Sequence, residues 1–278
     1  MGRKKDLLEL SKDTCPSCGE PFIGKHCYAC GEKKISRKDF ALSKYARQAF
    51  DHFTHLDTKV FRSFRFLIFK PGFLSLEFVK GRRVLYVKPL QVFVFINLIF
   101  FFFLGSSDIF SPRLQWIYAS EKMFIGNASV KAITDAKAAE LSMTVEAFIP
   151  YFDEKIGKYT KAALYLFIPV LALVLHGLYF RQYRHYLCHL IFATHWFAYV
   201  LLFFIVAAPA IQYMGLKAGP LLTSIALCLM PHLFLSLKLF YRQHAWLSAL
   251  KTLVVCLSFV FFLVVYRELM LWTTFQLL

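Results

Sequence analysis

Five long runs of apolar residues lie in this 278-residue chain, and short polar segments separate them. Each run is about as long as an α-helix must be to cross the hydrocarbon core of a bilayer. The runs are apolar on all sides and not along one stripe, which is typical of membrane spans and not of surface helices in soluble proteins. The pattern predicts helical spans at residues 84–104, 162–180, 187–207, 220–240 and 250–266.

Two amphipathic stretches precede the first run. We expect one helix over residues 36–69, ending at a Lys-Pro-Gly sequence, and a shorter one over residues 73–80. Apolar residues of the first helix share one face at 100° per residue: Phe53, Val60, Phe64 and Leu67. Helices that are apolar on one side and basic on the other commonly lie in the headgroup layer beside a span. Packing against the protein's own cytoplasmic module is the alternative, and we favour the membrane surface.

The charge of the chain is uneven along its length. Residues 1–88 hold 19 Lys and Arg against 9 Asp and Glu, whereas residues 105–161 hold seven of each. Because basic segments of membrane proteins remain in the cytoplasm, the N-terminus is predicted inside, and the neutral segment and the C-terminus outside. The neutral segment is predicted to form one or two helices on the outer surface. At the C-terminus, Trp272 and Phe275 are predicted to lie in an interfacial belt. Lys and Arg flank the spans, which favours anionic lipid headgroups over nucleic acid as partners.

A cysteine motif near the N-terminus is the most specific chemical signal in the chain. It has the spacing C-x2-C-x8-C-x2-C, and a glycine follows each pair. Two such knuckles bring four thiolates to one centre, which predicts a closed, structural Zn²⁺ site. Iron also accepts four thiolates, and disulfides are the alternative in an oxidising compartment; the predicted cytoplasmic location favours a metal. The predicted ligands are Cys15, Cys18, Cys27 and Cys30.

A second polar cluster lies in the expected connecting helix. A metal site could be drawn from its acids and histidines, but a polar helix face with local ion pairs is the simpler interpretation. The cluster consists of Asp51, His52, His55, Asp57 and Arg62.

Polar residues inside the predicted spans are the third candidate. Ionisable groups within a membrane are rare and normally face the interior of the helix bundle. Several histidines could bind heme or a second metal, or relay protons, but the predicted spans around them carry no acid to support a metal centre. Hydrogen bonding between helices is the default interpretation. These candidates are Asn97, His176, His189, His195 and His232.

The chain resembles a known bacterial membrane family in its ordered motifs. These are "CPSCG…CYACG", "FTHLDTKVFRSFRFLIFKPG", "EFVKGRRVLYVKP", "HLIFATHWF" and "KLFYRQHAWLSALK". The family is the domain of unknown function 3667. The resemblance implies a zinc-ribbon protein of the bacterial inner membrane and brings no established activity. Near the third span the family carries an acid and a histidine. At these two positions this chain has Cys188 and Phe197 instead.

The sequence therefore predicts an all-α, multi-span membrane protein with a zinc ribbon. The expected divisions are a ribbon at 1–35, amphipathic connecting helices at 36–83 and a membrane domain at 84–278. The chain carries none of the nucleophile, phosphate-loop or zinc-protease motifs of soluble enzymes. The first hypothesis is a non-enzymatic role in which the ribbon binds a cytoplasmic protein partner and the membrane domain senses, anchors or helps assembly. The second is a membrane enzyme or transporter that uses the intramembrane polar residues.

Overall fold

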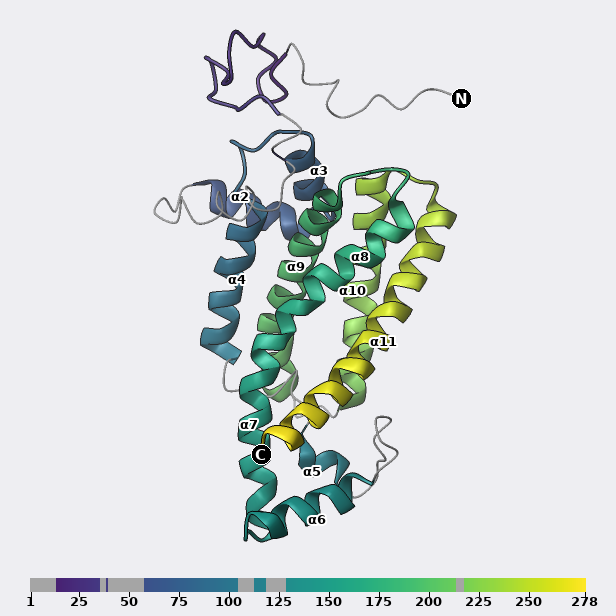
Figure 1. Ribbon diagram of the computed structural model, residues 1–278. Helices are drawn as coiled ribbons and strands as arrows, with labels where there is room; N and C mark the ends of the chain where they lie inside the picture. Colours follow the sequence, from purple (N-terminus) through teal and green to yellow (C-terminus); the bar gives the residue numbers. More distant parts are fainter. Residues whose placement is uncertain (1–13, 36–38, 40–57, 105–112, 119–128, 214–217) are drawn as a thin grey trace. The chain divides into compact units, whose positions relative to one another are not determined.

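The described part of the chain is helical apart from two isolated β-bridges near the N-terminus (Figure 1). The computed structural model describes residues 14–35, 39, 58–104, 113–118, 129–213 and 218–278. The predicted all-α class is confirmed for these residues. The candidates Asp51, His52, His55 and Asp57 lie outside them, as does most of the helix expected before residue 58.

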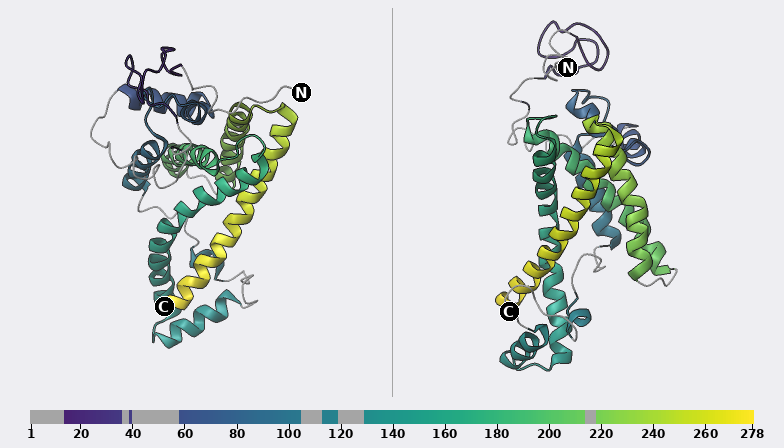
Figure 2. Two further views of the ribbon diagram at one scale, coloured as in Figure 1. Left: turned by 45° about the horizontal axis from the view of Figure 1, so that its top comes forward. Right: turned by 90° about the vertical axis from the view of Figure 1, so that its right-hand side faces the viewer.

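The chain forms two compact units. The first comprises residues 1–104 and 168–255, and the second comprises residues 105–167 and 256–278. The helices of the first unit are α2 (Thr58–Phe69), α3 (Phe73–Val79), α4 (Pro89–Leu104), most of α8 (Phe167–Tyr179), α9 (Tyr186–Tyr213), α10 (Ala218–Tyr241) and the start of α11 (Ala245–Leu277). Helices α4 and α9 lie side by side and form the main packing contact of this unit (Figures 1 and 2).

The short helix α3 is buried in the first unit, where we had expected a position at the membrane surface. All of its residues from Leu74 to Val79 are buried, and it packs against α9 and α10. Gly72 makes this approach possible: its φ is +77°, and a Cβ there would lie 2.5 Å from the backbone oxygen of Ser236 in α10. Only glycine adopts this left-handed turn without strain and also leaves room for the second backbone.

Helix α2 also turns its predicted apolar face to the protein. Leu67 is buried, and the rings of Phe64 and Phe95 in α4 lie 5.6 Å apart. The opposite face carries exposed phenylalanines, Phe61 at 83% and Phe69 at 74% exposure. The sequence periodicity located the buried face of α2, and this face is covered by α3, α4 and α9.

Within the described part of the chain, two helices are long and apolar enough to cross a membrane. Residues Tyr186–Pro209 of α9 form one, with 61% of the apolar window buried, and α11 forms the other, with only 17% buried. The remaining apolar helices in the described residues are shorter: Pro89–Leu104, Phe167–Tyr179 and Leu229–Tyr241. Helix α4 is short because it begins at Pro89, whose ring suits the first helical turn and whose nitrogen carries no hydrogen to bond.

The second unit has a hydrophobic core of its own. The helices of this unit are α5 (Leu114–Ile117), α6 (Val130–Glu140), α7 (Val145–Ala163), the 3₁₀ turn η2 (Leu164–Leu166) and α11 from residue 256 onward. The Asp153 carboxylate accepts a hydrogen bond from the Leu114 N–H (2.7 Å), which caps α5. The ring of Phe275 lies 4.5 Å from the ring of Phe152 and is buried in this core. The sequence predicts an interfacial position for Phe275.

Candidate metal centre

The four predicted cysteine ligands meet in one place. Their sulfur atoms all lie within 4.8 Å of one another, and the shortest pairs are 3.4 Å and 3.5 Å apart. A disulfide would bring two sulfurs to about 2.0 Å, so these cysteines are free. A tetrahedral ion with sulfur bonds of about 2.3 Å needs sulfurs about 3.8 Å apart, which this cluster matches. The residues therefore fit a four-thiolate metal site.

The two knuckles repeat the same backbone geometry. The N–H of Cys15 donates to the carbonyl of Glu20 (2.7 Å), and the N–H of Cys27 donates to the carbonyl of Glu32 (2.8 Å). Gly19 and Gly31 follow with φ of +85° and +74°, the left-handed conformation that the knuckle requires. The sequence motif Cys-x-x-Cys-Gly-Glu thus builds two equivalent halves around one centre.

Backbone hydrogen bonds at the second knuckle stabilise the thiolate form of the cysteines, which is the form that binds a cation. Burial raises the pKa of the Cys27 thiol, but the N–H groups of Cys30 and Ala29 stabilise the thiolate and lower its pKa to about 7. The N–H of Glu32 lowers the pKa of Cys30, yet burial and the neighbouring sulfurs together raise it to about 12. Four sulfurs at this spacing therefore ionise together only when a positive ion shares their charge.

Glu32 joins the metal module to the helical part of the first unit. One carboxylate oxygen of this side chain, which is 1% exposed, accepts three hydrogen bonds. The donors are the Ser17 hydroxyl at 2.8 Å, the Arg83 N–H at 2.9 Å and the Val84 N–H at 3.0 Å. Because Ser17 lies between two metal ligands and Arg83 lies just before α4, this carboxylate bridges the module and the loop that leads into α4.

Close packing supports the same contact. Gly81 has a φ of +94°, and a Cβ at this position would lie 2.3 Å from the Ile35 side chain and 3.5 Å from Pro16. Lys33 also forms an ion pair with the buried carboxylate of Asp39 at 2.8 Å. The module is thus packed against residues 81–84 through the Glu32 carboxylate and the close approach of Ile35 and Pro16 to Gly81.

The loop that receives Glu32 lies within a segment that has known relatives. Residues 57–101 match a family model described as protein of unknown function DUF3667. This confirms the predicted resemblance for that segment, which covers α2, α3, the Glu32-bound loop and most of α4. No curated protein and no solved structure matches the chain.

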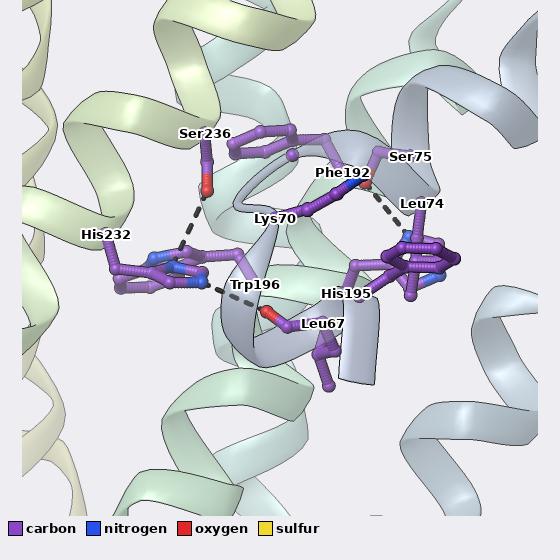
Figure 3. Close-up of a pocket in the computed structure, with 11 residues that line it drawn as sticks. Leu67, Lys70, Leu74, Ser75, Phe192, His195, Trp196, His232 and Ser236 are labelled. Atoms are coloured by element: carbon purple, nitrogen blue, oxygen red, sulfur yellow. Dashed lines mark hydrogen bonds between the residues drawn. The ribbon is translucent and has the colours of Figure 1, made fainter. Parts of the chain in front are cut away.

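A buried histidine pocket lies where the DUF3667 segment meets α9 and α10 (Figure 3). His195 Nδ1 lies 2.9 Å from the Ser75 hydroxyl, and both side chains are buried. The Nε2 atom of His195 has no hydrogen-bond partner among the described residues. The cavity has a volume of about 10 Å³, which is room for one water molecule at most. This pocket has space for a hydrogen-bonded solvent molecule and not for an organic substrate.

His232 has a structural partner in the same pocket. Its Nε2–H donates to the carbonyl of Leu67 (3.2 Å), which assigns the tautomer, and its Nδ1 lies 3.5 Å from the Ser236 hydroxyl. Leu67 is in the last turn of α2, where carbonyls have no partner within the helix. His232 therefore caps α2 from α10.

The other two candidate histidines, His176 and His189, lie together where α8 and α9 meet. The ring centroids of His176 and His189 are 5.1 Å apart. His189 accepts at Nδ1 from the Tyr241 hydroxyl (2.7 Å) and donates from Nε2 to the carbonyl of Tyr183 (3.0 Å). Lys251 caps α8 nearby, where its ammonium donates to the Leu178 carbonyl (2.8 Å). These contacts fasten helix ends to one another, as hydrogen bonds between membrane helices commonly do.

The remaining predicted residues are separate from the cysteine cluster. Asn97 is half-buried on α4, and Arg62 is exposed on α2. Among the described residues, the four cysteines are the only group of three or more His, Cys, Asp or Glu side chains whose potential ligand atoms lie together. Cys188 and Phe197 are both buried, and Phe197 packs 6.1 Å from Phe93, ring to ring.

Sequence reasoning missed the polar groups that connect segments distant in the chain. Glu32, Ser75 and Lys251 acquire their roles from partners that lie 15 to 120 residues away in the sequence. A usable signal existed for Glu32, because the same acid follows both Cys-x-x-Cys-Gly knuckles. Glu77 was visible as the lone acid between residues 58 and 104, and its carboxylate pairs with Arg82 at 2.9 Å.

Proposed function

We propose that this chain is a multi-span protein of the bacterial inner membrane, with its N-terminus in the cytoplasm and its C-terminus outside. Helix α11 is the main support, because its apolar window is 17% buried although the helix is 33 residues long. A core helix of a soluble protein would be covered by protein, whereas a long exposed apolar face suits lipid. Five spans, including α4, α8 and α10, belong to the same proposal.

The basic segments of the first unit support this orientation. Burial and then the nearby charge of Arg242 lower the pKa of Lys80; the Glu77 carboxylate opposes this shift, and Arg82 adds to it. Arg242 follows α10, whereas Lys80 and Arg82 precede α4, so the basic loops on either side of these apolar helices converge. Loops that share an excess of positive charge belong on the cytoplasmic side under the positive-inside rule.

We infer that the metal is a structural Zn²⁺ and that the module serves a sensing, anchoring or assembly role and not catalysis. The observation that carries this inference is the Glu32 contact, which fastens a closed four-thiolate site to the loop before α4. A site whose ligands are all supplied by protein has no open position for substrate. Ile23 and Tyr28 of the module remain 85% and 65% exposed and would meet a cytoplasmic protein partner.

A histidine-based enzyme or transporter is the weaker proposal. His232 and His189 hydrogen-bond to carbonyls of the chain itself, and the cavity beside His195 is about 10 Å³. These groups are occupied in holding helices together.

Complementation of a knockout tests the two proposals against each other. The phenotype of the knockout is measured after replacement with Cys15→Ser, with the double variant Ile23→Ser/Tyr28→Ser, or with His195→Gln, at matched protein levels. The docking proposal predicts that the first two variants fail and that His195→Gln complements. Full activity of the cysteine and surface variants, together with loss of function in His195→Gln, would exclude it in favour of the intramembrane site.

Reporter fusions test the orientation separately. A C-terminal phosphatase fusion should be active, and a C-terminal green fluorescent protein fusion should be dark, because only the outside permits the first and only the cytoplasm permits the second. The opposite pair of results would reject the five-span arrangement.

A further inference from the structure

The outward face of α2 combines phenylalanines and cations in an arrangement that the apolar runs did not indicate. Phe61 and Phe69 are exposed at 83% and 74%, and Arg62 and Arg65 are exposed on the same side. Neither α2 nor the turn that follows it contains an acid. Large exposed aromatic rings beside uncompensated positive charge mark a surface that contacts something both apolar and anionic.

An open hollow of about 490 Å³ lies on this face. Its lining residues are Arg65, Phe66, Phe69 and Lys70. The Lys70 ammonium is 5.0 Å from the centroid of Phe66 and 5.5 Å from that of Phe73, so the two rings hold it beside the hollow. The structure shows no ion pair for Arg65 or Lys70 with any described residue. The hollow therefore offers an aromatic wall and two cations that form no ion pair with an acid in the described part of the chain.

We propose that Arg65 and Lys70, with Phe66 and Phe69, bind the headgroup phosphate of an anionic phospholipid. This inference rests on the proposed membrane location. A guanidinium and an ammonium complement the phosphate, and the exposed Phe69 ring lies against the glycerol and the first acyl carbons. A free inorganic anion would leave that ring in water, so the aromatic wall favours a lipid over phosphate alone.

The position of the hollow suits the boundary between the membrane and water. Helix α2 ends one residue before Lys70, and it packs beside the first turns of α4 through Phe64 and Phe95 (Figure 1). Helix α4 starts the first apolar run at Pro89. Lipid headgroups are commonly contacted by a cation at the end of an apolar span and by an aromatic ring next to it.

Lipid titration of the full chain tests the site. Protein in a zwitterionic detergent is titrated with dioctanoyl phosphatidylglycerol, with dioctanoyl phosphatidylcholine and with inorganic phosphate, and bound molecules are counted by native mass spectrometry. We expect phosphatidylglycerol to bind more tightly than phosphatidylcholine. Removal of each cation should weaken the phosphatidylglycerol complex about fivefold, the usual effect of one Lys or Arg at an anionic membrane surface.

The variants are Arg65→Gln, Lys70→Gln and their combination, which should lose affinity about 25-fold. Arg184→Gln is the matched control, because Arg184 is an exposed cation outside the hollow. Phe69→Ser should weaken the lipid complex and leave any phosphate binding unchanged. Each variant is accepted only if its thermal unfolding midpoint matches that of the unmodified protein.

Three outcomes would overturn the assignment. If the double variant bound phosphatidylglycerol as tightly as the unmodified protein does, Arg65 and Lys70 would not belong to the site. If inorganic phosphate fully displaced phosphatidylglycerol, the site would be one for free anions. If the double variant no longer co-purified with an acidic protein but still bound lipid as the unmodified protein does, the face would be assigned to a protein partner. Phosphatidylglycerol binding that depends on Arg65, together with reversed reporter fusions, would leave the lipid site in place and reject only the proposed orientation.

Discussion

Replacement of Glu32 by alanine is the sharpest test of how the metal module is held. One oxygen of Glu32 accepts three hydrogen bonds at 2.8, 2.9 and 3.0 Å, and the side chain is 1% exposed. A hydrogen bond to a charged group contributes about 1.5 to 3 kcal/mol to stability. The three bonds contribute less than their sum, because a buried carboxylate costs free energy and water can reach the half-buried Arg83 and Val84. We expect the alanine variant to destabilise the docked module by about 2 to 4 kcal/mol.

Amide hydrogen exchange measures this effect at the affected bonds. A local loss of about 2 to 4 kcal/mol should speed exchange of the Arg83 and Val84 amides by about 30- to 700-fold. The measurement uses the metal-loaded full chain in detergent, with a peptide from the middle of α9 as the internal reference. Glu32→Gln is the conservative control: its amide oxygen can accept the same three bonds without charge, so about half the loss of free energy is expected.

Two results would refute this reasoning. Unchanged exchange at residues 83–84 in Glu32→Ala would show that the carboxylate does not hold the loop. Equal acceleration in the α9 reference would show global destabilisation instead of release of one contact. Metal content must remain at the level of the unmodified protein, because loss of the ion would disrupt the module independently of Glu32.

Three further perturbations follow from single contacts. Cys15→Ser should abolish the one metal ion per chain that elemental analysis is expected to find, with little change in far-ultraviolet circular dichroism, because the described part of the module contains no α-helix. Gly72→Ala forces alanine into a φ of +77° against the backbone of Ser236, and chemical unfolding should show a loss of about 2 to 4 kcal/mol; a neutral result would mean that α3 does not pack there. Lys251→Met removes the 2.8 Å cap on Leu178, and the unfolding free energy should fall by about 1 to 2 kcal/mol, whereas no change would show that solvent replaces the cap.

The cysteine cluster was predictable because its chemistry is local. Each Cys-x-x-Cys-Gly knuckle builds its own turn, and four thiolates can share one cation only if the two knuckles face each other. The structure brings the four sulfurs within 4.8 Å, as the spacing requires. The metal module and its ligands could therefore be assigned from seventeen consecutive residues.

The histidine candidates show what sequence could not decide. A histidine in an apolar run has the same appearance whether it binds a metal or caps a helix. His232 donates to a carbonyl of α2 that lies 165 residues earlier in the chain, and nothing local to His232 indicates that partner. Only the approach of α10 to α2 distinguishes the structural role from a catalytic one.

Helix α2 combines both situations. Its period of 3.6 residues grouped Val60, Phe64 and Leu67 on one face, and these residues are half-buried or buried. Phe53, the fourth member of the predicted face, lies outside the described residues. Periodicity cannot report what covers that face, since lipid and protein are equally apolar. The structure places protein there and leaves Phe61 and Phe69 outside with the cations.

The sequence by itself therefore determined the helical class, the long apolar runs and the composition of the metal site, because each depends on residue type and short-range spacing. Only the tertiary structure decided that α3 is buried, that Glu32 holds the module to residues 83–84 and that His232 caps the end of α2. The physical reason is that buried polar groups must find partners, and those partners are supplied by whichever distant segment the packing brings near.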